Sequence, residues 1–301
     1  MTAALEALGD RAWHVIHGDC MDPVTGLPSL PAASVTHVIT DPPYEAEAHT
    51  MQRRIKKHHG GGIYGVDDAP LVFAAMTPEL RVTVGAAIGR ITCRWVLVFC
   101  QVEAVTAWRD ALTSDGSLKY KRACIWVKPD GQPQLTGDRP GMGYESIVTA
   151  HAPGRSRWNA GGRVGVYYAM RNQDHGPRHL RHQTVKPLPL MESLIRDFTD
   201  PGDLIVDPFT GSGSTGVAAV RLGRRFLGWE VDERFHAHAV RRLTDAREQT
   251  ELTSLEAFER AATVKRQQTT LLVDPVPPPG PIDDVARWLD SLAAPDDEAA
   301  D

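Results

Sequence analysis

A short turn near the N-terminus has residues that could hold an amine. Residues 35–40 have the pattern of a strand, and this strand leads directly into Asp41-Pro42-Pro43-Tyr44. Proline has no backbone N–H, so this turn offers a carboxylate and carbonyl acceptors without a competing donor at two positions. Such acceptors can bind both protons of an exocyclic amino group, and Tyr44 adds a flat face for stacking. The turn could therefore bind an aromatic amine, although Asp-Pro-Pro also occurs in ordinary turns.

A second candidate site lies in the C-terminal third of the chain. The apolar run at 204–206 leads into Asp207-Pro208-Phe209-Thr210-Gly211-Ser212-Gly213. Glycines permit a tight turn there and let a ligand approach the main chain at a helix N-terminus. Glu230 ends the next strand-like run, where a carboxylate can accept hydrogen bonds from ribose hydroxyls. This pattern indicates a nucleotide site.

The same spacing also fits a nicotinamide-binding oxidoreductase. Gly211, Gly213 and Gly216 with Glu230 match the dinucleotide-binding pattern. After Glu230, however, the chain has one helix-like stretch and then a proline-rich acidic end, which leaves no strand–helix units to complete a nicotinamide site. The order of the elements disfavours the oxidoreductase. A plain turn with a helix cap is the non-functional alternative.

Short apolar runs alternate with helix-like stretches along most of the chain. Strands are expected at residues 13–17, 35–40, 95–99, 123–127, 146–150, 204–206 and 225–229. Helices are expected at residues 71–90, 103–112, 188–198, 215–222 and 233–247. This alternation predicts one wound α/β sheet of seven strands.

The charge of the chain is unevenly distributed. Residues 251–301 contain eleven acidic and four basic residues, so the first 250 residues contain 29 basic against 27 acidic ones despite a net charge of −5. The 42% of apolar residues can form a large core, and no leader or membrane-length apolar run is present. We expect a soluble cytoplasmic protein. The four cysteines lack the spacing of a metal site. The histidines at 175, 179 and 182 have a spacing compatible with a metal, but no cysteine or acidic cluster accompanies them, so no metal is expected.

The order of these motifs resembles that of the β group of DNA amino-methyltransferases. In that permuted family a D-P-P-Y motif precedes an F-x-G-x-G motif, as Asp41-Pro42-Pro43-Tyr44 precedes Phe209-Thr210-Gly211-Ser212-Gly213 here. His17-Gly18-Asp19-Cys20 resembles the family's G-D element, and Thr184-Val185-Lys186-Pro187 resembles its T-x-K-P element. Its intermediate strand motifs resemble Trp126-Val127-Lys128 and Tyr144-Glu145. The resemblance covers residues 13–247.

The resemblance implies a Rossmann-like fold that binds S-adenosylmethionine, with a mostly parallel sheet and one reversed strand. It implies methyl transfer to an amino group of a DNA base, held by Asp41, Pro42, Pro43 and Tyr44. The implied cofactor residues are Asp19, Asp41, Thr184, Lys186, Asp207, Phe209, Gly211, Ser212, Gly213 and Glu230. Asp207 could equally serve to order its loop.

Aspartate at the first position of the motif favours adenine N6 as the target. The nearest alternative is cytosine N4, since serine is more common at that position in those enzymes. A DNA-binding module without catalytic activity is a more distant alternative. The sequence leaves open the recognised DNA word, the choice between a monomer and a homodimer, and the existence of a separate restriction endonuclease.

Two irregular segments, at about 45–68 and 152–182, interrupt a catalytic domain predicted at 1–250. Both contain clustered basic residues and glycines, so we expect them to contact duplex DNA, from which the target base must be flipped. The expected contacts are Arg53, Arg54, Lys56, Lys57, Arg155, Arg157, Arg163, Arg171, Arg178 and Arg181. Residues 251–301 are expected to form an acidic, proline-rich and mostly disordered tail.

Overall fold

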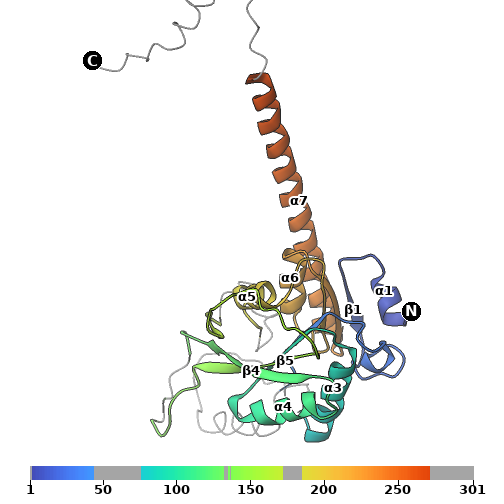
Figure 1. Ribbon diagram of the computed structural model, residues 1–301, viewed down its shortest axis with the longest axis vertical. Coiled ribbons are helices and arrows are strands. Elements are labelled where there is room, and N and C mark those ends of the chain that lie inside the picture. Colours follow the sequence, from blue (N-terminus) through green and yellow to red (C-terminus); the bar gives the residue numbers. More distant parts are fainter. Residues whose placement is uncertain (1, 44–75, 132–134, 136, 172–184, 272–301) are drawn as a thin grey trace, which may run out of the picture. The chain divides into compact units, whose positions relative to one another are not determined.

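A computed structural model describes residues 2–43, 76–131, 135, 137–171 and 185–271 (Figure 1). The chain divides into two compact units, residues 1–250 and 251–301. The first unit contains the sheet and every element that positions the candidate site. The segment predicted to contact DNA at 45–68 lies outside the described residues.

The described strands form one eight-stranded sheet in the order β1-β8-β7-β2-β3-β5-β4-β6. Only β5 is antiparallel to its neighbours, β3 and β4, so the predicted α/β class with one reversed strand is confirmed. The strand bounds are β1 (Trp13–His17), β2 (His37–Thr40), β3 (Trp95–Cys100), β4 (Lys119–Val127), β5 (Tyr144–His151), β6 (Val166–Tyr168), β7 (Leu204–Asp207) and β8 (Arg225–Glu230).

The prediction of seven strands missed β6. This three-residue strand lies in a segment predicted to be irregular and pairs in parallel with the end of β4. The Ile125 N–H donates to the Gly165 carbonyl at 2.9 Å, and a Cβ on Gly165 would lie 2.7 Å from the Cys124 sulfur. So short an edge strand has no detectable periodicity, because it depends on its partner strand and on a close backbone approach.

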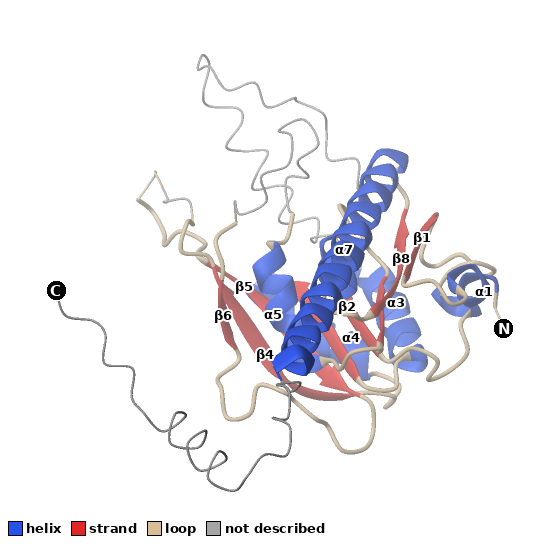
Figure 2. Ribbon diagram, turned by 90° about the horizontal axis from the view of Figure 1, so that it is seen from above, coloured by secondary structure: helices blue, strands red, loops and turns tan. Residues whose placement is uncertain are grey.

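Helices cover both faces of the sheet (Figure 2). Buried side chains of α1 (Ala3–Leu8), α3 (Pro78–Ile91) and α4 (Val105–Thr113) share one apolar cluster with Val96 and Val98 of β3. Those of α5 (Leu188–Phe198), α6 (Ser214–Arg221) and α7 (Glu233–Leu271) share a second cluster with Leu97 and Phe99. Successive β3 side chains thus enter opposite cores, which explains the uninterrupted apolar run of this strand.

Helix α7 extends well beyond the predicted end at residue 247. The expectation of disorder from residue 251 onward is therefore wrong for residues 251–271, which are helical. Residues 248–271 contain no glycine or proline and are rich in strong helix formers, whereas the first proline comes at 275. The acidic composition of residues 251–271 was therefore not a sufficient reason to predict disorder. Residues 272–301 lie outside the described residues.

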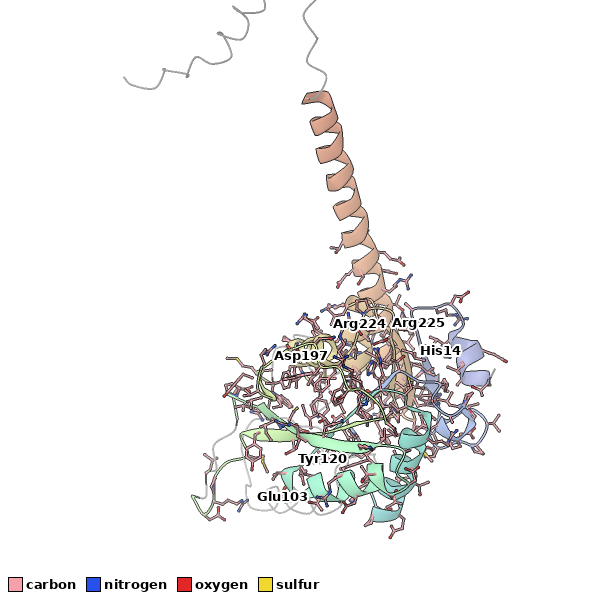
Figure 3. All side chains as sticks on the ribbon, in the orientation of Figure 1. His14, Glu103, Tyr120, Asp197, Arg224 and Arg225 are labelled. Atoms are coloured by element: carbon pink, nitrogen blue, oxygen red, sulfur yellow. The ribbon has the colours of Figure 1, made fainter. Side chains whose placement is uncertain are left out.

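The parallel strands bring the candidate residues to one edge of the sheet. Strands β1, β8, β7, β2 and β3 have their carboxyl ends at this edge, and the reversed strand β5 begins there, with Ser146 opposite Cys100. Asp41, Asp207 and Glu230 stand at or just after the ends of β2, β7 and β8. At the opposite edge, the Arg224 guanidinium donates to the Thr199 carbonyl at 2.6 Å, with Asp197 near the end of α5 (Figure 3).

Gly216 determines how closely α6 packs on β8 and α7. A Cβ at this position would lie 2.7 Å from the Phe226 ring and 2.9 Å from a Leu243 methyl carbon. We predict that Gly216→Ala destabilises the protein by about 1–3 kcal/mol, because the overpacking outweighs the gain in helix propensity. Urea unfolding would measure the change. Gly162→Ala is the control, since no atom lies within 4 Å of that Cβ; equal stability of both variants would contradict the prediction.

Candidate active site

The Asp41 carboxylate lies in a chain of alternating charges. The Lys186 ammonium, just before α5, forms an ion pair with Asp41 Oδ2 and lies 3.3 Å from Glu145 Oε1. Lys128, which follows β4, lies 2.9 Å from Glu145 Oε2. The Lys186 and Glu145 side chains are only 6% and 4% exposed, so these charges are largely removed from water and depend on one another.

The Asp41 side chain is partly buried, at 22% exposed, and this affects its protonation. Burial raises its pKa to about 6, with Glu145 acting in the same direction and Lys186 in the opposite one. Asp41 Oδ1 is buried and has no hydrogen-bond partner within the described part of the chain. A buried acceptor in this state favours a ligand that brings its own donor.

Two aromatic rings support Lys186. Its ammonium nitrogen is 5.0 Å from the centre of the Phe99 ring and 5.9 Å from that of Trp126. The Lys128 nitrogen is 4.5 Å from the centre of the Trp126 ring. The rings add cation–π attraction and restrict the two lysine side chains.

The glycine loop between β7 and α6 is ordered by Asp207. Its Oδ1 accepts a hydrogen bond from the Thr40 hydroxyl at 2.7 Å and one from the Phe209 N–H at 3.0 Å. Burial raises the pKa of Asp207 to about 6, although these two donors and Thr215 oppose the shift. This geometry gives Asp207 the loop-ordering role that was one of its two expected roles, and it links the loop to the end of β2. Direct contact of Asp207 with a ligand stays a prediction.

Gly211 and Gly213 have the left-handed conformations that the loop requires, with φ angles of 53° and 83°. The Gly211 N–H donates to Glu230 Oε2 at 2.8 Å, and the Asp232 N–H donates to Oε1 at 2.9 Å. Burial raises the pKa of Glu230. Each oxygen retains a further lone pair, so Glu230 can still accept a hydroxyl.

Sequence reasoning missed Arg242 of α7. Its Nη1 donates to the Ser212 carbonyl at 2.6 Å and lies 3.1 Å from the Ser212 hydroxyl and 3.3 Å from the Ser214 hydroxyl. Arg242 therefore fixes the middle of the glycine loop from outside. The sequence contains no signal for this contact, because it depends on where α7 packs.

The other predicted site residues differ in their exposure, and two of them lie outside the described residues. Asp19 is exposed just beyond β1, and its Oδ1 accepts from the Met21 N–H at 2.8 Å. Pro42 is buried and Pro43 partly buried beside Asp41. Tyr44 and Thr184 lie outside the described residues. The structure thus brings Asp41 and Lys186 together, and it brings Gly211 and Glu230 together.

Of the residues predicted to contact DNA, four are described. Arg155, Arg157 and Arg163 are exposed, and Arg163 lies 3.6 Å from Asp197. Arg171 is held by Asp130, whose carboxylate oxygens accept the Arg171 N–H at 3.0 Å. The remaining six residues, Arg53, Arg54, Lys56, Lys57, Arg178 and Arg181, lie outside the described residues.

Among the described residues, no cluster of His, Cys, Asp and Glu side chains could hold a metal ion. The histidines at 175, 179 and 182 fall outside those residues. No helix within the described ranges is both long and apolar enough to cross a membrane.

A wound sheet with an acidic turn and a glycine loop at one edge defines an α/β protein of the methyltransferase class. Residues 93–241 match the family model described as DNA methylase, N6_N4_Mtase. YubD of Escherichia coli (strain K12) is 27% identical over 239 residues, 76% of this chain and 88% of the relative. The type II methyltransferase M2.DpnII of Streptococcus pneumoniae is 49% identical over 63 residues, 21% of this chain and 24% of the relative.

A similarity to solved structures agrees with this class. The crystal structure of the M1.HpyAVI–SAM complex superposes with a TM-score of 0.54 at 23% identity, covering 77% of this chain and 98% of that one. This likeness shows the fold, that of S-adenosylmethionine-dependent methyltransferases. The match of residues 93–241 and the similarity to M2.DpnII support the N6/N4 family of DNA methyltransferases.

The ion pair with Lys186 predicts how the pKa of Asp41 responds to substitution. Lys186→Met removes the cation that most lowers this pKa, so we expect the pKa to rise above its present value of about 6. Carbon-13 NMR titration of labelled aspartate carboxyl groups would measure it, with the Asp41 signal assigned by Asp41→Asn. Lys128→Met is the matched variant and should raise the pKa less, because Lys128 contributes less to it. An unchanged or lower pKa in Lys186→Met would contradict the prediction.

Proposed function

We propose that this DNA methyltransferase transfers the methyl group of S-adenosylmethionine to N6 of adenine in duplex DNA. The observation that carries the proposal is the Asp41 carboxylate, which has one oxygen bound by Lys186 and the other buried without a hydrogen-bond partner among the described residues. An exocyclic amino group has the donors that this oxygen lacks. Aspartate at the start of the motif, by its resemblance to the family, favours adenine over cytosine.

The glycine loop and the carboxylates at the carboxyl ends of the strands have the chemistry needed to bind S-adenosylmethionine. S-adenosylmethionine supplies an electrophilic methyl group on a positively charged sulfur. Asp19, Asp41, Asp207 and Glu230 all lie at this edge, so its carboxylates favour a cation. The left-handed glycines expose main chain at the start of α6, and Glu230 can accept a ribose hydroxyl. These residues, with Lys186, Phe209 and Ser212, are the proposed cofactor pocket.

Asp41 acts on the amine in this mechanism. An aromatic amine is a weak nucleophile, because its lone pair is delocalised into the ring. Hydrogen bonds to Asp41 Oδ1 and the Pro42 carbonyl favour a more tetrahedral nitrogen, which directs the lone pair at the methyl group. Bound S-adenosylmethionine would supply the methyl group, so that the N–C bond would form as the C–S bond breaks and leaves its electron pair on sulfur. The nitrogen then loses one proton through Oδ1, the acceptor to which it is already bonded.

Reaching this carboxylate requires the base to leave the duplex stack. We propose that the exposed side chains of Arg155, Arg157 and Arg163 contribute salt-dependent contacts to phosphates. Arg171 is fixed by Asp130, so its main role in the described structure is to order the segment after β6.

Product analysis tests the proposal. The protein is incubated with unmethylated DNA and S-adenosylmethionine, and the digested nucleosides are identified by mass spectrometry. We expect N6-methyladenine, and a reduction of about 10²–10³-fold in kcat for Asp41→Ala with little change in S-adenosylhomocysteine affinity. If the product were N4-methylcytosine, the target base would be cytosine instead of adenine, and the proposed methyl transfer to an exocyclic amine would stand. An Asp41→Ala variant with full activity would overturn the role of the turn.

Arg242 provides a separate test of the cofactor pocket. Arg242→Met removes three polar contacts to the glycine loop, so we expect affinity for S-adenosylhomocysteine to fall about tenfold by calorimetry. Arg241→Met is the control, since Arg241 is exposed and its guanidinium lies 3.4 Å from His238. Equal affinities of the two variants would show that Arg242 does not support the cofactor pocket.

A further inference from the structure

Glu145 is a buried carboxylate at the edge of the sheet where Asp41 lies. It is the second residue of β5, opposite Trp126 of β4 in the strand register. Its side chain is 4% exposed, with Oε1 lying 3.3 Å from the Lys186 nitrogen and Oε2 2.9 Å from the Lys128 nitrogen. Each oxygen of Glu145 therefore faces a different lysine.

The strand itself does not require a charge at this position. The following β5 residues, Ser146 to His151, are all buried, and an apolar side chain would meet the packing needs of such a strand. Burying a carboxylate costs free energy that its partners only partly return, and replacement of buried ion pairs by apolar residues is often neutral or stabilising. Glu145 must therefore be explained by what it does to its partners.

The partner that matters is Lys186. A lysine side chain is long and flexible, and fixing it costs roughly 2 kcal/mol of rotamer entropy. The Phe99 and Trp126 rings limit its movement but do not direct the ammonium toward Asp41. Glu145 Oε1 is a second carboxylate oxygen that holds the ammonium beside Asp41, and Lys128 holds Glu145 in turn.

We propose that Glu145 is a positioning residue for methyl transfer. It anchors Lys186 so that the ammonium binds Asp41 Oδ2 and leaves Oδ1 for the amino group of the base. The inference rests on the proposed function and extends it to a residue that does not touch the substrate. Among the described residues, the charged groups that act on Asp41 are Lys186 from the segment before α5, Glu145 of β5 and Lys128 after β4, and Asp41 in turn acts on Asp207 of β7.

The arrangement also explains why two lysines are needed. Asp41 and Glu145 together carry two negative charges, and a single ammonium shared between them would leave one charge uncompensated. Lys128 supplies the second positive charge at Glu145 Oε2, so Lys186 can remain engaged with Asp41. The four side chains form a neutral set in a site with little water.

A kinetic double-mutant cycle on the full chain tests the inference. Wild type, Glu145→Gln, Lys186→Met and the double variant are assayed for methyl transfer to DNA at saturating S-adenosylmethionine. We expect Glu145→Gln to lower kcat about tenfold, while KM for DNA and affinity for S-adenosylhomocysteine change less than about twofold. In the Lys186→Met background the same substitution should have almost no further effect, because its target is already lost.

Asp197→Asn is the matched control. Asp197 is buried like Glu145 and accepts the Tyr167 hydroxyl at 3.0 Å, but it lies near the far end of α5, roughly 14 Å along the helix from its start. This variant should lose thermal stability and keep kcat. If Glu145→Gln does not fold, Lys128→Met serves instead, with a smaller loss of kcat that again disappears in the Lys186→Met background.

The outcomes distinguish a failure of the proposed function from a failure of the proposed role of Glu145. A wild-type protein that methylates no DNA base would overturn the proposed function, and this inference with it. An active wild type overturns the inference alone if Glu145→Gln keeps full kcat. The inference would also be overturned if the double variant lost kcat by the product of the two single losses. Such a result would mean that Glu145 does not act through Lys186.

Discussion

The ion pair between Lys186 and Asp41 joins parts of the chain that are far apart in sequence. Asp41 follows β2, whereas Lys186 immediately precedes α5, and Glu145 of β5 also lies within ion-pair distance of Lys186. Because these charges are largely buried, none is stable without the others, so the start of α5 must lie against the ends of β2 and β5. The same contact delivers a carboxylate with one oxygen engaged and one available. The requirement to neutralise buried charge therefore positions the group that is proposed to bind the amine.

The order of strands explains how a permuted sequence builds a continuous site. The first strand, β1, pairs with the last strand, β8, so that His17 lies opposite Glu230. Between β8 and β3 the sheet places β7 and then β2, and the Thr40 hydroxyl donates to Asp207 across that junction. The glycine loop and the turn at Asp41 thus become neighbours although about 165 residues separate them in the chain. Their order in the sequence is irrelevant to their order along the edge.

Periodicity was sufficient for the buried strands and for most helices. Strands such as β3, with apolar residues on both faces, produce continuous apolar runs, and candidate residues at the ends of such runs must share an edge when the sheet is parallel. Periodicity could not find β6, the contacts of Arg242 or the pairing of Glu145 with two lysines. Each of these depends on which elements are neighbours in space, and no short-range pattern records that. Helix α7 continues to Leu271 because strong helix formers without glycine or proline favour the helix even where the chain is acidic.

The geometry at Asp41 also explains why one family can serve two bases. In the proposed mechanism, Asp41 Oδ1 and the Pro42 carbonyl bind the –NH₂ group, which adenine and cytosine both present. The proposed amine-binding chemistry of the turn would therefore suit both bases, and the aspartate at position 41 favours adenine only through its resemblance to the family. The chain Lys128–Glu145–Lys186 acts on the shared part, so it would serve N6 and N4 transfer equally.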